Sequence, residues 1–191
     1  MAFPRSGTVD TQTFSGTKDF IRAKLLTPQT TNIGAADHLK FDTVDFSRPS
    51  VTQVTGALGG AAVTLDTTTA YSATVGAASI GRFSVRGGKL YKLKMDPLYV
   101  LSSGITGLLI LQWVDVTVLA AQVLLGTPLQ ISPVSSAVNE FGSGSLETFY
   151  NAGGGQNDIF LLEVQIIGAP TALTQIGSAT KGQPTALVET F

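Results

Sequence analysis

The chain has 191 residues, of which 43% are hydrophobic and 13% are charged, and its formal net charge at pH 7 is -1. A chain of this length buries roughly 70% of the surface that its unfolded form exposes, so one domain is stable without disulfide bonds. Because it has no cysteine and one histidine, thiolate and multi-histidine metal sites are excluded. The near-zero net charge argues against nucleic acid or an anionic membrane as a partner.

The charged fraction is about half of that in an average soluble protein. A monomer surrounded by water normally carries more charge on its surface. We therefore expect part of the uncharged surface to lie against other chains.

Residues 1–36 show neither a helical nor a two-residue hydrophobic period, and Phe3, Phe14 and Phe20 are scattered among polar residues. This pattern predicts an N-terminal arm, either extended along a partner or disordered. Disordered leaders usually lack aromatic residues, so the three phenylalanines favour an arm that docks on a surface. We place the globular domain at residues 37–191.

The first half of this domain shows short strand signals. Leu39 and Phe41 alternate with polar residues, which predicts a half-buried strand, and Val44 and Phe46 continue one residue out of phase, as a β-bulge produces. Gly87-Gly88 predicts a tight turn that joins two strands into a β-hairpin. Strands are expected at residues 61–65, 71–75, 80–85 and 89–95.

The second half contains the most apolar run, residues 99–125. Asp115 and several Ser, Gln and Gly residues interrupt it, so two buried strands explain it better than a membrane span. Residues 108–116 and 159–167 are apolar on both faces, which implies cover on both sides by a packed sheet or by another chain. Further strands are expected at residues 122–125, 129–131, 146–150 and 185–191.

No segment shows the pattern of an amphipathic helix, whereas strand signals recur about every ten residues between Gly and Pro. The sequence therefore predicts an all-β fold, a jelly-roll sandwich of two antiparallel sheets with an extended N-terminal arm.

His38 lies beside Asp37, Asp42 and Asp45, which suggests a carboxylate–histidine pair or a calcium site. Calcium loops need oxygen ligands that converge on a tight turn, whereas side chains along a strand diverge. We interpret these residues as the solvent-facing side of an edge strand.

Glu163 is a carboxylate within a strand that otherwise has a buried pattern, and a buried carboxylate needs a partner. We expect it either to face solvent on the outer side of a sheet or to pair with Arg82 or Arg86, in this chain or a neighbouring subunit. No second acid or base stands at a spacing that would support catalysis.

The glycine-rich segments 141–145 and 153–155 match neither a phosphate-binding loop nor a nucleophile elbow. Lys92 and Lys94 are expected on the solvated face of their strand, opposite Leu93 and Met95. We expect a protein that is not an enzyme and that takes no cofactor.

Six motifs in this order resemble small tailed-phage virion proteins whose β domain is similar to the tumour-necrosis-factor and complement globular-head jelly roll. The likeness covers about residues 36–191. The motifs are ADHLKFD at 36–42, SIGRF at 79–83, GKLYKL at 88–93, LQW at 111–113, TQIGSA at 174–179 and PTALVE at 184–189.

The resemblance implies a homotrimer with the last strand near the threefold axis. It also implies a virion role, as a capsid decoration (cement) protein that binds the major capsid protein or as the receptor-binding knob of a tail fibre or head spike that recognises a host surface glycan. Only about 35 residues precede the domain, which favours decoration of the outer capsid surface by a protein made in the host cytoplasm.

Candidate contact residues follow from the doubly apolar strands and the aromatic arm. Strands that are apolar on both faces suggest a symmetric interface, which resembles a protein core. For the trimer interface we select Phe41, Trp113, Tyr150, Phe160, Leu162 and Phe191. For the capsid contact we select Phe3, Arg5, Phe14 and Phe20, in an arm that orders on binding.

Overall fold

The computed structural model describes most of the chain from Phe20 onward. The described residues are 20–31, 33–48, 62–65, 69–72, 81–96, 100–132, 140–142, 144–155, 158–169, 171–177 and 183–191. They form fourteen β-strands, all paired antiparallel, and no helix. The predicted all-β sandwich is confirmed.

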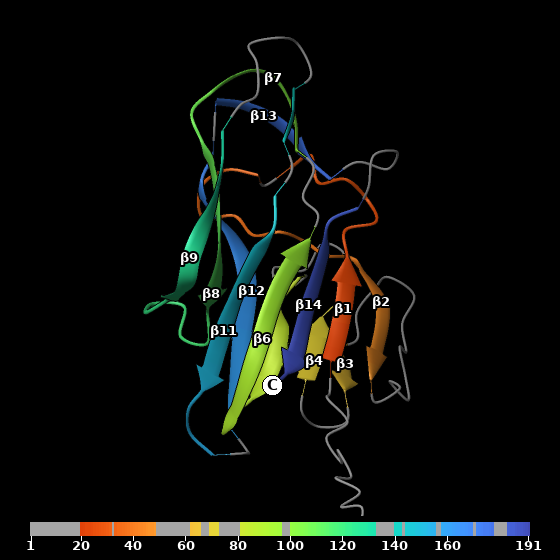
Figure 1. The fold of residues 1–191 in the computed structure, drawn as a ribbon, viewed down its shortest axis with the longest axis vertical. Helices are drawn as coiled ribbons and strands as arrows, with labels where there is room; N and C mark the ends of the chain where they lie inside the picture. The colour runs from red at the N-terminus through yellow and green to blue at the C-terminus, as the bar shows by residue number, and fades with distance from the viewer. Residues whose placement is uncertain are drawn as a thin grey trace, which may run out of the picture.

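One layer of the sandwich is a five-stranded sheet, in front in Figure 1. Its order brings strands from the two ends of the chain side by side, as a jelly roll requires. In spatial order the strands are β11 (Leu146–Ala152), β6 (Lys89–Asp96), β14 (Thr185–Thr190), β1 (Phe20–Lys24) and β2 (Thr43–Arg48).

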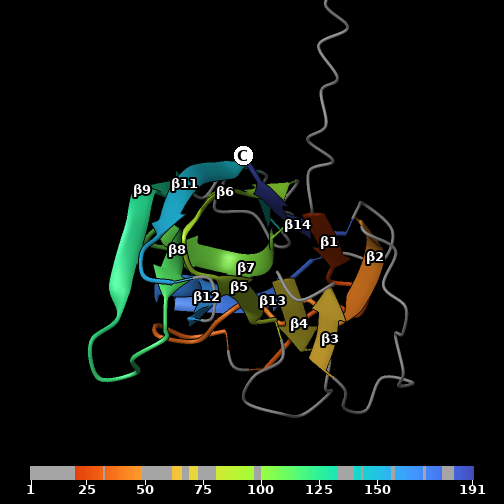
Figure 2. The same cartoon turned by 90° about the horizontal axis from the view of Figure 1, so that it is seen from below.

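The other layer is a six-stranded sheet, and the two layers face each other when the sandwich is viewed end-on (Figure 2). In spatial order its strands are β3 (Ala62–Leu65), β4 (Thr69–Ser72), β5 (Phe83–Arg86), β12 (Ile159–Gly168), β8 (Leu109–Asp115) and β9 (Val123–Ile131).

A third sheet of three strands lies at one end of the molecule, at the top of Figure 1. Its strands are β10 (Glu140–Gly142), β7 (Val100–Thr106) and β13 (Thr171–Ile176).

The core lies between the two large sheets and is built by the two-residue alternation along each strand. Phe83 stands at its centre, with its ring centroid 5.7 Å from that of Trp113 and 6.3 Å from that of Phe41. All three side chains are fully buried, together with Tyr91 and Leu93 from the facing sheet. The buried side of β6 carries Tyr91, Leu93 and Met95, and the other side carries the two lysines, as predicted.

The β-hairpin predicted across Gly87-Gly88 is wrong, because the two strands belong to different sheets. β5 pairs with β4 and β12, whereas β6 pairs with β11 and β14. The two glycines turn the chain from one layer to the other. Gly87 lies against the backbone carbonyls of Gly153 and Gly155, where a Cβ atom would collide, and Gly88 has a φ of 73°.

The boundary predicted at residue 36 is wrong, because β1 lies inside the five-stranded sheet between β14 and β2. Ile21, Ala23 and Leu25 point into the core and are at most 2% exposed. Residues 1–19 of the predicted arm lie outside the described residues. A bulge does occur in this region, but it lies between Val44 and Phe46, where the register with β1 shifts, and not between Phe41 and Val44 as predicted.

Residues 39–42 are not a strand of the main ladders, although the predicted burial of Leu39 and Phe41 is confirmed. The segment lies beside β12 beyond the first residue of β5, and so continues the six-stranded sheet there. Leu39 N donates to Val164 O at 2.8 Å, and His38 forms a bridge with Gln165 of β12. Gly81, with a φ of 84°, packs directly on the backbone of Leu39, so a side chain there would separate the segments.

The predicted strands at 122–125 and 129–131 are one strand, β9, with an irregularity opposite Gln112. Gly126 there has a φ of 68°, a conformation that glycine adopts without strain. No helix that could cross a membrane occurs in the described part of the chain.

Candidate functional site

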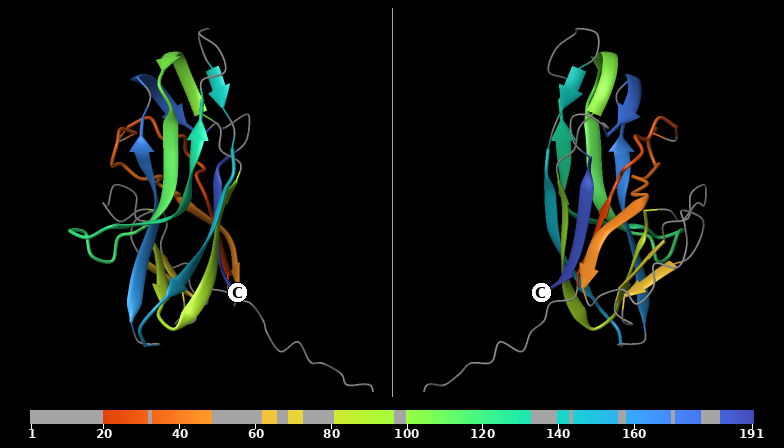
Figure 3. Two further views of the ribbon diagram at one scale, coloured as in Figure 1. Left: turned by 60° about the vertical axis from the view of Figure 1, so that its left-hand side comes forward. Right: turned by 90° about the vertical axis from the view of Figure 1, so that its right-hand side faces the viewer.

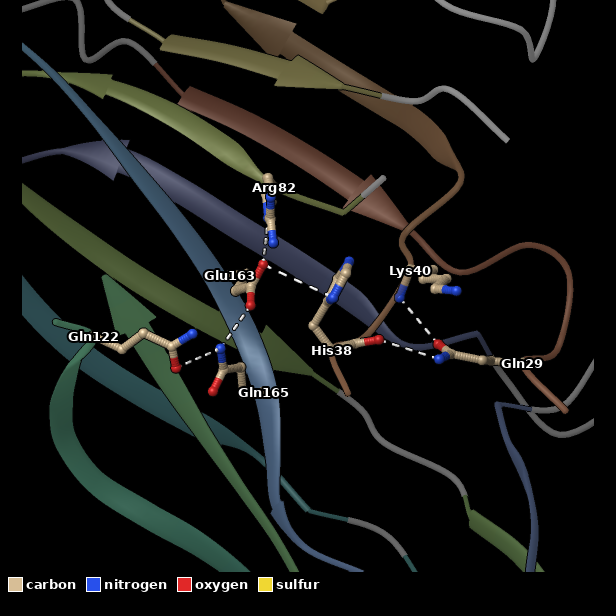
Figure 4. A network of polar contacts seen from close by, with 7 residues as sticks. All are labelled: Gln29, His38, Lys40, Arg82, Gln122, Glu163 and Gln165. Carbon is tan, nitrogen blue, oxygen red and sulfur yellow. Dashed lines mark hydrogen bonds and ion pairs between the residues drawn. The ribbon is translucent and has the colours of Figure 1, made fainter. Parts of the chain in front are cut away.

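A buried polar network lies on the face of the six-stranded sheet that points away from the core (Figure 4). Its centre is Glu163 of β12, which is 2% exposed. Arg82 Nε donates to Glu163 Oε2 at 2.6 Å, and His38 Nδ1 lies 3.9 Å from the same oxygen. Gln165 Nε2 donates to the other carboxylate oxygen at 2.7 Å. Both carboxylate oxygens are therefore engaged.

The network extends to both sides of Glu163. Gln165 Nε2 also donates to Gln122 Oε1, at 3.2 Å, which ties the β8–β9 loop to β12. The side chain of Gln29 bridges two backbone groups, because its Nε2 donates to His38 O and its Oε1 accepts from Lys40 N. The network thereby connects segments that are far apart in the sequence.

The pairing of Glu163 with Arg82, one of the predicted alternatives, is confirmed, and both residues belong to the same chain. The interpretation of His38 and Asp42 as solvent-facing is wrong. The side chain of His38 is 12% exposed and faces Glu163. Asp42 is buried, and its carboxylate accepts hydrogen bonds from Leu26 N at 2.7 Å and Thr27 N at 3.0 Å.

The arrangement is suited to holding the sheet together rather than to catalysis. A general acid or base must reach a substrate, whereas the Glu163 carboxylate is buried and bonded to a cation and an amide. No group of three His, Asp or Glu residues that could hold a metal ion occurs among the residues that the structure describes.

Asp115, at the end of β8, forms a second structural contact. Tyr150 Oη donates to Asp115 Oδ2 at 2.6 Å, and Thr117 N donates to Asp115 Oδ1 at 2.9 Å. Burial, together with the hydrogen bond to Asp115, raises the pKa of Tyr150 well above its usual range. The phenol therefore stays protonated as a donor, and the contact links β11 of one sheet to the end of β8 in the other.

The outer face of the five-stranded sheet carries exposed charge. Lys92 Nζ lies 3.1 Å from Glu147, and Lys94 pairs with Asp96, which raises the pKa of the Lys94 ammonium. These pairs confirm the expected solvated face of β6.

A pocket of about 360 Å³ lies beside these pairs. The residues that line it come from β1, β6 and β14 and combine two apolar side chains with several charged ones. They are Phe20, Arg22, Lys94, Asp96, Thr185, Leu187 and Glu189.

Two apolar clusters are exposed in the described part of the chain. On the five-stranded sheet, Phe149 and Phe191 stack edge to face with ring centroids 5.3 Å apart, and they are 50% and 67% exposed. At the edge of the other sheet, the β8–β9 loop and the start of β9 expose Val118, Leu119, Val123 and Leu124. The sequence pattern does not reveal this second cluster, because apolar residues alone do not show whether their strand is covered.

The residues selected for the trimer interface do not share one surface. Phe41, Trp113 and Leu162 are fully buried in the core of one chain, so they have no accessible side chain for a neighbour. Tyr150 is 8% exposed, and half-buried Phe160 stacks on its ring at 6.0 Å. Of the six, Phe191 alone is extensively exposed.

β8 and β12 were expected to be covered on both sides, by a packed sheet or by another chain, and the middle of each strand is covered within one chain. Gln112, Val114, Glu163 and Gln165 lie on the face that points away from the core and are at most 6% exposed within one chain. The polar side chains among these four residues form hydrogen bonds inside the chain. Gln112 Nε2, for example, donates to Gly126 O at 2.7 Å.

Of the residues selected for the capsid contact, Phe3, Arg5 and Phe14 lie outside the described residues. Phe20 begins β1, where it is half-buried and lines the pocket of the five-stranded sheet. No protein-family model matches the chain, and a comparison with curated proteins finds no significant match.

Proposed function

We propose that the protein is a structural virion protein, a homotrimeric capsid decoration protein that binds and stabilises a tailed-phage head through the major capsid protein. The placement on a virion rests on the resemblance of the six sequence motifs. The observation that favours a structural role is that three carboxylates are engaged in contacts within the chain. Glu163, Asp42 and Asp115 each stabilise a junction between segments of the fold.

The exposed apolar clusters support a protein that acts through contact surfaces. Phe149 and Phe191 leave half or more of their side chains in solvent. Large exposed apolar side chains that gather in patches commonly mark protein–protein contacts. Phe191 follows β14, the strand that the resemblance places near a threefold axis.

The test uses phage heads that lack the protein. We expect the purified full chain to sediment as a trimer and to bind such heads in hundreds of copies, counted by cryo-electron microscopy. Replacing Phe3 and Phe14 by serine tests the arm. Thr127→Ser, at an exposed position of β9, is the control for a serine introduced outside the arm. If the arm variant binds phage heads in as many copies as the wild type, the arm is not part of the capsid contact.

A receptor-binding knob is the second candidate, and the pocket beside Phe20 favours it. An aromatic ring beside Arg22, Asp96 and Thr185 offers stacking and polar contacts to a sugar. This candidate predicts that the purified protein binds host cells and that Phe20→Ala weakens this binding. Binding to cells without binding to heads would replace the decoration proposal by this one.

A further inference from the structure

The β8–β9 loop (residues 116–122) and the start of β9 expose four large apolar side chains. Val118, Leu119, Val123 and Leu124 are 58%, 63%, 55% and 55% exposed, and we call these four residues the 118–124 patch. Val123 and Leu124 are successive strand residues and point to opposite faces of the sheet. The patch therefore wraps around the outer edge of β9.

Contacts with the body of the sandwich hold the loop in place. Ala121 N donates to Val118 O at 2.8 Å, which closes a turn at the tip. At the base, Thr117 Oγ1 accepts from Leu161 N at 2.9 Å, and Gln122 accepts from Gln165 of the buried network. The loop projects from the sandwich in Figure 3 (left). Because its shape is already fixed, docking costs little conformational entropy.

β9 is the terminal strand of its sheet, and no described strand pairs with its outer edge. Proteins protect such edges with lysine, proline or bulges, because an open apolar edge pairs with other chains. Pro128 and the irregularity at Gly126 protect the second half of β9 in this way. The first half, which contains Val123 and Leu124 of the patch, has neither a charge nor a proline.

The charge distribution indicates what covers the patch. Residues 116–132 contain no Asp, Glu, Lys or Arg, so a charged partner surface would find no counter-charge there. The pocket on the five-stranded sheet is lined by Arg22, Lys94, Asp96 and Glu189, and an apolar loop inserted there would desolvate these charges. An identical patch, in contrast, brings only uncharged apolar side chains against it.

We propose that the 118–124 patch is a self-association surface, covered in the assembled protein by the same patch of a second copy of this chain. Two copies that meet through the same patch are related by a twofold axis, so this contact is additional to the threefold contact of the proposed function. β9 and β1 lie on opposite sides of the sandwich (Figure 2), so the patch is separate from the pocket beside Phe20.

The first arm of the test measures self-association by sedimentation over a concentration series. Leu119→Lys places a charge in the middle of the patch, and Gln130→Lys places the same charge at an exposed position near the other end of β9. We expect Leu119→Lys to raise the concentration for half-association at least about tenfold and Gln130→Lys to leave it unchanged.

The second arm does not depend on a charged substitution. The chain has no cysteine, so an introduced thiol is the only one that reacts. We expect Leu119→Cys to give covalent dimers with a short bismaleimide at dilute concentration and Gln130→Cys to give none.

If Leu119→Lys associates as the wild type does and Leu119→Cys gives no cross-linked dimer, the patch is not a self-association surface. This result would not contradict the oligomer of the proposed function. Loss of binding to phage heads by Leu119→Lys with unchanged self-association would also overturn it and assign the patch to the capsid contact. A wild-type chain that stays monomeric at every concentration would overturn the self-association itself.

Discussion

The two sheets of the sandwich both carry ion pairs on the face that points away from the core, in very different surroundings. On the six-stranded sheet, Arg82 pairs with Glu163, which is 2% exposed. On the five-stranded sheet, Lys92 pairs with Glu147, whose side chain is 42% exposed. A buried charge has lost its hydration and depends on its partner, whereas an exposed charge is solvated with or without one.

This difference in burial indicates which charges the fold requires. Arg82 and Glu163 stand 81 positions apart in the sequence, and their contact joins the turn before β5 to β12. Backbone ladders hold the strands of both pairs together, because Phe83 beside Arg82 pairs with Leu162 beside Glu163, and β6 pairs with β11. The two pairs therefore differ in burial: the buried carboxylate requires its cation, and the exposed pair mainly keeps its sheet face hydrated.

The largest effect is expected from Arg82→Met, which leaves the Glu163 carboxylate buried without its cation. We expect a loss of about 3 kcal/mol in the free energy of unfolding, measured with urea. The double variant Arg82→Met with Glu163→Gln removes both charges and should recover most of this loss. A cost below about 1 kcal/mol for the single variant would contradict the importance of the buried pair.

An intermediate effect is expected from Tyr150→Phe, which removes the hydrogen bond between β11 of one sheet and β8 of the other. Because the acceptor Asp115 is charged, we expect a loss of about 1.5 to 2 kcal/mol near pH 7. The pKa of Tyr150 is raised above its ordinary value of 10.0 in the folded protein, so this contribution is complete below pH 10 and declines as the pH rises further.

Unfolding free energies measured at pH 7.5 and at pH 10.5 or above test the direction of this pH dependence. The stability difference between wild type and Tyr150→Phe should shrink at the higher pH, since the phenylalanine has no proton to lose. The other tyrosines titrate in both proteins and cancel in the difference. A difference that grows with pH would show that the Tyr150 phenol does not act as the protonated donor.

The smallest effect is expected from Lys92→Met, the matched change on the exposed face. We expect a loss of at most about 0.5 to 1 kcal/mol, and none in molar salt, which screens exposed pairs. The same denaturation experiment at low and high salt measures it. A loss as large as that of Arg82→Met would remove the distinction between the two faces.

The fold class was predictable because strand alternation and turn glycines are local signals. β1 was missed although Ile21, Ala23 and Leu25 alternate with Arg22 and Lys24, since five residues within an unpatterned segment give a weak period. The sequence around Gly87-Gly88 predicts one hairpin, because local sequence does not show which of two sheets a strand joins.

The candidate site was predictable in part. A carboxylate in a buried strand requires a cation, which identified Arg82 among two candidates for Glu163. The partner of His38 could not be found this way, because three aspartates lie near it in the sequence while the carboxylate that it faces lies on β12. The burial of Phe41, Trp113 and Leu162 within one chain likewise depends on long-range packing, so aromatic and leucine content did not separate core from interface.

The position of β14 between β6 and β1 has a consequence for how the chain acquires its structure during synthesis. β14 is translated about 160 residues after β1, yet it supplies the backbone partners of both β1 and β6. Until it emerges from the ribosome, those two strands have open edges and their apolar sides lack neighbours. Assembly of this sheet is therefore a late event, and the nascent chain depends on protection from aggregation until then.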